Sequence, residues 1–154
     1  MPHTLRVPPR LIVGPGSISG LGEGVASLGK RPLLVTGRQG LRQSGATEHI
    51  LSLLADARLQ TTLFEEVETE PSCETCDRVR DTLQSGHCDV VVGAGGGSAL
   101  DAAKVAAGLA GEEPPTLEFW NDRKPTRPGV PFVAVPTTSG TGAEATTNAV
   151  ITNT

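Results

Sequence analysis

Residues 89–104 read DVVVGAGGGSALDAAK, and this stretch decides the fold. The three valines Val90–Val92 predict a short buried strand, residues 93–97 a glycine-rich turn, and the alanines that follow a helix beginning near Ser98. Glycine lets the backbone turn sharply and lets a ligand approach it closely. The unpaired N–H groups and the dipole of a helix start stabilise an anion. The order of strand, glycine turn and helix start therefore predicts a site for a phosphate or a nucleotide.

A helix cap is the alternative explanation of the same residues. Ser98 and Asp101 match the S-x-x-D capping pattern, which stabilises a helix start without any ligand. A tight turn between a strand and a helix also needs glycine for steric reasons alone. Because one glycine suffices for a turn and residues 93–97 contain four, phosphate binding is the favoured interpretation.

Composition narrows the class of protein. A chain of 154 residues is the size of one domain. Its net charge of -4 argues against a nucleic-acid partner, because no basic surface is available to neutralise phosphates. The sequence has no apolar run long enough to span a membrane and no N-terminal signal pattern, which predicts a cytoplasmic protein with no membrane partner.

The three cysteines predict buried small side chains. Cys73 and Cys76 form a C-x-x-C pair, and Cys88 precedes the valine strand. A zinc site would need further ligands at suitable spacing, and an odd number of cysteines argues against a disulfide framework. Small apolar packing is therefore the favoured role. No histidine stands at a suitable spacing for a metal; the three are His3, His49 and His87.

Strand and helix patterns alternate along the chain. Near-continuously apolar strands in such an alternation predict a single α/β domain, Rossmann-like, with a doubly wound, mostly parallel sheet. Residues 111–130 are rich in proline and charge and are expected to form a long loop, which Phe119 and Trp120 would anchor. The short apolar run at residues 11–13 is expected as the first strand, and residues 32–36, the second, and 61–64, the third, follow it. Two more are expected at residues 90–92 and 132–135, and those at 32–36, 90–92 and 132–135 are expected to be buried. Helices are expected at residues 18–28, 50–57, 72–85 and 98–109.

Ligands of doubly wound sheets bind beyond the carboxyl ends of the strands. Three loops are expected there: residues 37–40, 93–98 and 137–142. The first and third contain glycine, and the third is also rich in threonine. These loops are the candidate ligand-binding segments.

Two of these segments resemble a known family. GGGSALDAAK (Gly95–Lys104) and PTTSGTGAE (Pro136–Glu144) are similar to the paired signature of the iron-containing alcohol dehydrogenase family. GPGS at residues 14–17, PLLVT at residues 32–36 and the Glu70–Pro71 step also match elements of that family. The resemblance covers essentially the whole chain, and two long motifs in the right order are more specific than a lone G-x-G-x-x-G.

The resemblance implies an oxidoreductase that transfers a hydride between NAD(P)(H) and a small alcohol or aldehyde. Residues 1–154 would form its dinucleotide-binding domain, with the family's helical metal-binding domain absent. The glycine loop (residues 93–98) would hold the pyrophosphate. The threonine loop (residues 137–142) would lie near the nicotinamide and its ribose. Asp101 and Lys104 would support the glycine loop or approach the cofactor, although an Asp–Lys pair three residues apart is equally a local ion pair. The cofactor-binding residues so implied are Gly37, Arg38, Gly95, Gly96, Gly97, Ser98, Asp101, Thr137, Thr138 and Thr141.

One departure from the family bears on the cofactor. The family commonly has an aspartate at the end of the second strand, where it accepts hydrogen bonds from the adenosine ribose. This chain has Gly37 followed by Arg38, so the carboxylate that would repel a 2′-phosphate is missing and a cation stands beside it. NADP is therefore expected in preference to NAD. The alternative is that Gly37 only makes the turn and that Arg38 points to solvent.

A second departure concerns the metal and catalysis. The family holds Fe²⁺ or Zn²⁺ with one aspartate and three histidines of its helical domain, and none of this chain's histidines lies in a matching motif. No metal ligand and no catalytic residue is therefore assigned. A dinucleotide-binding module without catalysis of its own is the alternative function. A fragment of an enzyme like glycerol dehydrogenase or maleylacetate reductase, which belong to neighbouring families, is a further alternative, and dehydroquinate synthase is a more distant relative. A homo-oligomer is a further possibility.

Overall fold

The computed structural model describes residues 8–120 and 123–153 of the chain. Its centre is a four-stranded sheet in the order β2-β1-β3-β4, and every neighbouring pair of strands is parallel. The expected α/β, Rossmann-like fold is confirmed. The strands are β1 (Pro32–Gly37), β2 (Thr62–Val67), β3 (Val90–Gly95) and β4 (Phe132–Pro136).

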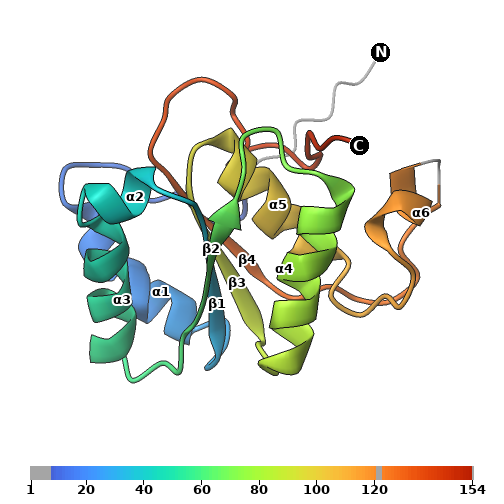
Figure 1. Cartoon of the computed structure of the whole chain (residues 1–154). Helices are drawn as coiled ribbons and strands as arrows, with labels where there is room; N and C mark the ends of the chain where they lie inside the picture. The colour runs from blue at the N-terminus through green and yellow to red at the C-terminus, as the bar shows by residue number, and fades with distance from the viewer. Residues whose placement is uncertain (1–7, 121–122, 154) are drawn as a thin grey trace, which may run out of the picture.

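Helices cover both faces of this sheet, as Figure 1 shows. On one face lie the short turn η1 and the helices α1, α2 and α3, and on the other lie α4 and α5. The short helix α6 packs against α4, away from the sheet. Their bounds are η1 Ser17–Gly20, α1 Leu21–Ala26, α2 Gly40–Gln43, α3 Ala46–Asp56, α4 Cys73–Ser85, α5 Gly97–Gly108 and α6 Thr116–Trp120.

The two central strands, β1 and β3, are buried because both faces of the sheet are covered. In β1, Leu33 and Val35 contact the core beneath α4 and α5, whereas Leu34 contacts the core beneath α1 and α3. The valines of β3 alternate in the same way between the two cores. Side chains of a strand point alternately to opposite faces, so a continuous apolar run supplies apolar side chains to both cores.

Helix α5 packs directly on β3, where Gly93 leaves room for it. A Cβ placed on Gly93 would lie 2.8 Å from the Cβ of Ala103 and 3.0 Å from the Phe132 ring. Alanines line the buried sides of α5, which the sheet and α4 cover. Small residues on both elements allow this close approach.

The segment 111–130 is held by polar contacts that sequence reasoning did not expect. The buried carboxylate of Glu112 accepts hydrogen bonds from the backbone N–H groups of Thr126 and, at 2.7 Å, Arg127. Asp77 on α4 accepts from both the N–H (2.9 Å) and the hydroxyl (2.7 Å) of Thr116. The expected anchors, Phe119 and Trp120, instead line a hollow at the surface.

Four local expectations were wrong. The expected long loop contains α6. Residues 11–13, expected as the first strand, form no strand and are exposed to solvent. The expected helix end at Leu28 lies beyond α1, which ends at Ala26, and Leu28 is 47% exposed. Strand β4, expected to be buried, is only half-buried, because β4 ends the sheet within the described part of the chain.

The cysteines are buried and free, as expected. Cys76 is fully buried between α4 and the sheet, and this burial raises the pKa of its thiol to about 12. Burial also raises the pKa of Cys73 and of Cys88. A neutral thiol behaves as a small apolar side chain. The described helices include none that is both long and apolar enough to cross a membrane.

The packing at Gly93 predicts that alanine destabilises the protein at this position but not at an open glycine position. Gly93→Ala should lower the free energy of unfolding by about 1–3 kcal/mol, because its methyl group would overlap Ala103. Gly24→Ala on α1 is the matched control, since nothing lies within 4 Å of a Cβ placed there, and it should be neutral or stabilising. Urea unfolding of both variants measures the difference; equal stabilities would contradict this packing.

Asp89 predicts a pH dependence of stability. Its carboxylate accepts the backbone N–H of Arg31 at 2.8 Å and of Lys30 at 2.9 Å, which ties the start of β3 to the start of β1. Burial opposes ionisation, but these N–H donors prevail and lower the pKa of Asp89. A lowered folded-state pKa gives stability that is complete above the unfolded value, about 3.9, and is lost as the pH falls through the folded value.

Asp89→Ala should therefore destabilise the protein by about 1–3 kcal/mol at pH 7. The gap between the variant and the unmodified protein should shrink at pH 3, when unfolding is followed in urea at both values. Asp81→Ala, an exposed change on α4, is the control for removal of one negative charge. A gap of the same size at both pH values would contradict the role given to the carboxylate.

Candidate functional site

A groove of about 870 Å³ crosses the carboxyl ends of β1, β2 and β3. The order of the strands reverses between β1 and β3, and ligands of open parallel sheets bind at such a point. The loop after β4 passes over the same edge of the sheet (Figure 1). The groove is lined by residues 37–41, Ser44, Ala46, residues 67–69, residues 95–99 and Thr137.

The groove contains the start of helix α5. The N-cap residue of α5 is Gly96, and no described side chain caps the helix. The first N–H groups of a helix have no acceptor within it, so this end is suited to an anion. The alternative of a Ser98–Asp101 capping box was wrong, because Ser98 lies inside the first turn and its Oγ accepts the N–H of Glu70 at 3.2 Å.

Gly95, Gly96 and Gly97 of this loop differ in whether the fold requires glycine at their positions. Gly95 has a φ of +137°, which other residues rarely adopt, and a Cβ on Gly97 would lie 2.9 Å from the Thr141 side chain. Gly96 differs from both: its φ is -78° and its ψ is -177°, and the atom nearest to a Cβ there is Thr138 Oγ1 at 3.5 Å. The fold itself therefore accepts a side chain at Gly96, and the open space at this position lies on the groove.

Gly37, at the end of β1, is likewise not required by the backbone. Its φ is not positive, and a Cβ there would meet only the Val67 carbonyl oxygen, at 3.6 Å. Its neighbour Arg38 is exposed and donates from Nε to the carbonyl oxygen of Glu66 at 3.3 Å. Both residues line the groove, so a guanidinium stands beside the space that a side chain at position 37 would fill.

The threonine loop meets the glycine loop. The N–H of Thr137 donates to the Gly95 carbonyl oxygen at 3.0 Å, which continues the pairing of β4 with β3. The side chains of Thr138 and Thr141 lie beside Gly96 and Gly97, as the distances above show. The structure thus brings together the segments that follow β1, β3 and β4.

The segment after β2 is a part of the groove that sequence reasoning missed. Glu68 lies there, and its carboxylate accepts from the N–H of Ser72 at 2.9 Å and from the Thr75 hydroxyl at 2.8 Å. Burial opposes its ionisation, but the donors, led by the Ser72 N–H, lower its pKa. The rule that ligands bind at the carboxyl ends of strands would have indicated this loop as well.

The predicted site residues divide into two groups. Asp101 lies outside the groove lining; its carboxylate pairs with Lys104 at 3.4 Å, which confirms the local ion pair. Thr138 and Thr141 lie beside the glycine loop without lining the groove. The predicted residues that line the groove are Gly37, Arg38, Gly95, Gly96, Gly97, Ser98 and Thr137.

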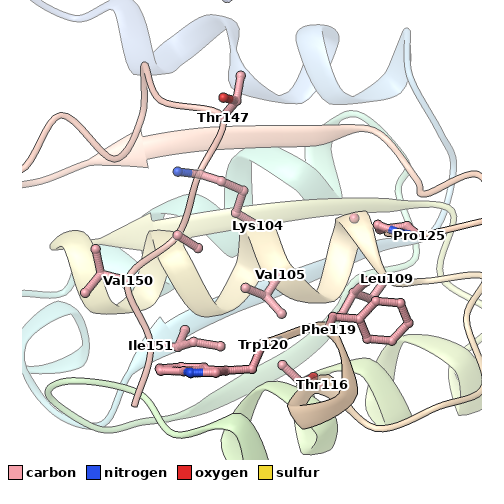
Figure 2. A pocket seen from close by; sticks show the side chains of 12 residues that line it. Lys104, Val105, Leu109, Thr116, Phe119, Trp120, Pro125, Thr147, Val150 and Ile151 are labelled. Carbon is pink, nitrogen blue, oxygen red and sulfur yellow. The ribbon is translucent and has the colours of Figure 1, made fainter. Parts of the chain in front are cut away.

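A second hollow, of about 610 Å³, lies on the other side of α5 (Figure 2). Val105 and Leu109 of α5 face Phe119 and Trp120 of α6 across it, and Ile151 lies beside them. Its lining is mainly apolar and shares no residue with the groove.

The described residues bring together no group of three or more histidine, cysteine, aspartate or glutamate side chains that could hold a metal ion. His49 and His87 are exposed and stand on separate elements, and His3 lies outside the described residues. Residues 8–120 and 123–153 therefore contain no set of ligands for the metal that the family resemblance implies.

The chain is similar to known alcohol dehydrogenases and to a related reductase. The probable alcohol dehydrogenase EutG of Escherichia coli is 36% identical, over 96% of this chain and 38% of its own length. The solved structure of the alcohol dehydrogenase ADH/D1 from an archaeal halo-thermophile of a Red Sea brine pool, bound to NZQ, has a TM-score of 0.92 at 32% identity, over 99% of this chain and 41% of that one. Sulfoacetaldehyde reductase of Bifidobacterium kashiwanohense, in complex with NAD+, has a TM-score of 0.85 at 25% identity, over 99% and 40%.

The chain spans about two fifths of the length of these relatives. Over nearly all of its own length it also matches the family model described as iron-containing alcohol dehydrogenase, which covers residues 8–154. The glycine loop, the threonine loop and the groove between them lie within that match. The chain therefore belongs to the iron-containing alcohol dehydrogenase family.

Proposed function

We propose that the groove binds NADP(H), and that this chain is the cofactor-binding part of an enzyme that transfers a hydride between the nicotinamide and a small alcohol or aldehyde. The observation that carries the cofactor part is the uncapped start of α5, where Gly96 is open although the fold would accept a side chain. The substrate class follows from family membership and from the named activity of the Escherichia coli relative.

The strand order suggests how the dinucleotide would lie. The pyrophosphate would sit at residues 95–98, because the α5 N-terminus offsets its negative charge. The adenosine would extend toward Gly37 and Arg38 at the end of β1, and the nicotinamide toward Thr137 at the end of β4. The cofactor would thus cross the sheet edge from β1 to β4 over the end of β3.

In such an arrangement the bound cofactor supplies or accepts the hydride. The residues of this chain bind and orient it: the glycine-loop backbone holds the phosphates, and the Ser98 hydroxyl lines the same space. The hydroxyls of the threonine loop supply further hydrogen-bonding groups beside the glycine loop. These are binding roles, and no residue of the chain is assigned to proton transfer.

The preference for NADP rests on Gly37 and Arg38. A Cβ at position 37 would make only an ordinary contact and the backbone φ there is not positive, so the turn does not require glycine. The nearby Arg42 pairs with Glu65 at 2.6 Å and with Glu48 at 3.3 Å. Arg38 instead donates from Nε to the Glu66 carbonyl oxygen, and the terminal nitrogens of its guanidinium would pair with a 2′-phosphate. A related reductase was solved with NAD+, so both cofactors must be compared directly.

Cofactor binding can be tested on the chain without any turnover. NADPH and NADH are titrated separately into the protein, and binding is followed by the fluorescence of the reduced nicotinamide. Tighter binding of NADPH is the expected result. Equal or tighter binding of NADH would overturn the NADP preference, and no binding of either cofactor would overturn the proposed function.

A dinucleotide-binding module without catalysis of its own is the second candidate. The observation that favours it is that the described residues hold no set of metal ligands. NADPH oxidation is measured with a panel of short aldehydes, with and without added Fe²⁺ or Zn²⁺. Turnover by this chain supports the enzyme, whereas tight cofactor binding with no turnover under any of these conditions supports the module.

Gly96→Ala should separate cofactor binding from folding. The added methyl group makes only ordinary contacts with Thr138, so the unfolding temperature should change little. The same methyl group would fill the space through which a phosphate approaches the backbone, and NADPH affinity should fall by about tenfold or more. Gly24→Ala on α1 is the control and should leave the affinity unchanged; full NADPH affinity of Gly96→Ala would contradict this placement of the pyrophosphate.

Arg38→Gln and Arg42→Gln form a matched pair for cofactor choice. Both remove one positive charge, but only Arg38 lines the groove, so only Arg38→Gln should weaken NADPH, by roughly tenfold to a hundredfold, while leaving NADH almost unchanged. Gly37→Asp should reverse the preference in favour of NADH. Fluorescence titration measures all three variants; the same NADPH loss in both arginine variants would indicate a general charge effect instead.

A further inference from the structure

A polar clasp joins α5 to the segment that follows the threonine loop. The Asp101 carboxylate accepts the N–H of Val150 at 3.1 Å with one oxygen and faces Lys104 Nζ at 3.4 Å with the other. Lys104 Nζ donates in turn to the Asn148 carbonyl oxygen at 2.8 Å and to the Thr146 hydroxyl at 3.2 Å. Figure 2 shows Lys104 extending from α5 to the segment that carries Thr147 and Val150.

The clasp is more than a surface ion pair. The side chains of Asp101 and Lys104 are only 10% and 14% exposed, so their charges are largely removed from water. Removal of one partner from such a pair leaves the other charge poorly compensated, so loss of either partner is destabilising. Two of its four contacts also go to backbone groups of residues 148 and 150, and these fix the path of the chain rather than a side chain.

The threonine loop has little packing of its own between its two anchors. It is held at its start by the hydrogen bond from Thr137 to Gly95 and beyond its end by the clasp. Between residues 138 and 145 only Ala143 is buried. Because both anchors belong to the unit formed by β3 and α5, the position of the loop follows the position of that unit.

We infer that Asp101 is a positioning residue for cofactor binding: through Val150 and Lys104 it holds the threonine loop against the start of α5, beside the nicotinamide half of the cofactor. This inference rests on the proposed function. Asp101 itself does not line the groove, and it acts through the chain segment that it fixes. One helix thereby carries the pyrophosphate site at its first turn and the support of the threonine loop one turn later.

The test compares the binding of NADPH with the binding of a ligand that contains only its adenosine half. Asp101→Ala should weaken NADPH binding by about tenfold. It should leave the affinity for adenosine 2′,5′-bisphosphate, which lacks the nicotinamide half, unchanged within about twofold, because that ligand occupies the Gly37–Arg38 end. Lys104→Gln should give the same pattern, and Asp101→Asn should recover part of the loss since its amide oxygen can still accept the Val150 N–H.

Asp81→Ala, an exposed change on α4, is the control for loss of one aspartate, and calorimetric titration serves both ligands. Equal weakening of both ligands, or no weakening of either, would overturn the inference, because a merely structural role would not distinguish the two halves. Should the unmodified chain bind neither ligand, the proposed function fails first and the inference fails with it.

Discussion

The close packing of α5 on β3 is the constraint on which the rest of the structure depends. Gly93 lacks the Cβ that would otherwise meet Ala103, so the helix lies directly on the middle of the sheet. That position puts the start of α5 beside the ends of β1 and β4, where the groove lies. The same helix carries Asp101 and Lys104 to the segment that returns from the threonine loop.

Much of the fold could be predicted because its elements are locally consistent. Apolar runs such as Val90–Val92 form strands that are buried on both faces, and Ser72 caps α4 where the sequence indicated a helix start. Helix α6 and the half-buried state of β4 could not be predicted in this way. They depend on contacts such as Asp77 with Thr116, 39 residues apart, and on which strand ends the sheet.

The candidate site shows the same division. Glycine-rich and threonine-rich loops can be recognised from sequence because they follow predicted strands, and seven of the ten predicted residues line one groove. The role of Ser98 could not be inferred locally, because its hydroxyl accepts from Glu70, 28 residues earlier in the chain. The contribution of Glu68 was missed for a different reason: its partners Ser72 and Thr75 are close in the chain, but no glycine-rich or threonine-rich motif marks the loop after β2.

The central claim is that the uncapped start of α5 is where the cofactor phosphates bind. A titration of the isotopically labelled chain with NADPH, followed by amide chemical shifts, tests this most directly. We expect the largest shifts on the N–H groups of Gly96, Gly97 and Ser98, and nearly unchanged shifts around Val105 and Phe119. Shifts concentrated at Val105, Leu109 and Phe119, with a silent glycine loop, would place the ligand in the apolar hollow and contradict the account.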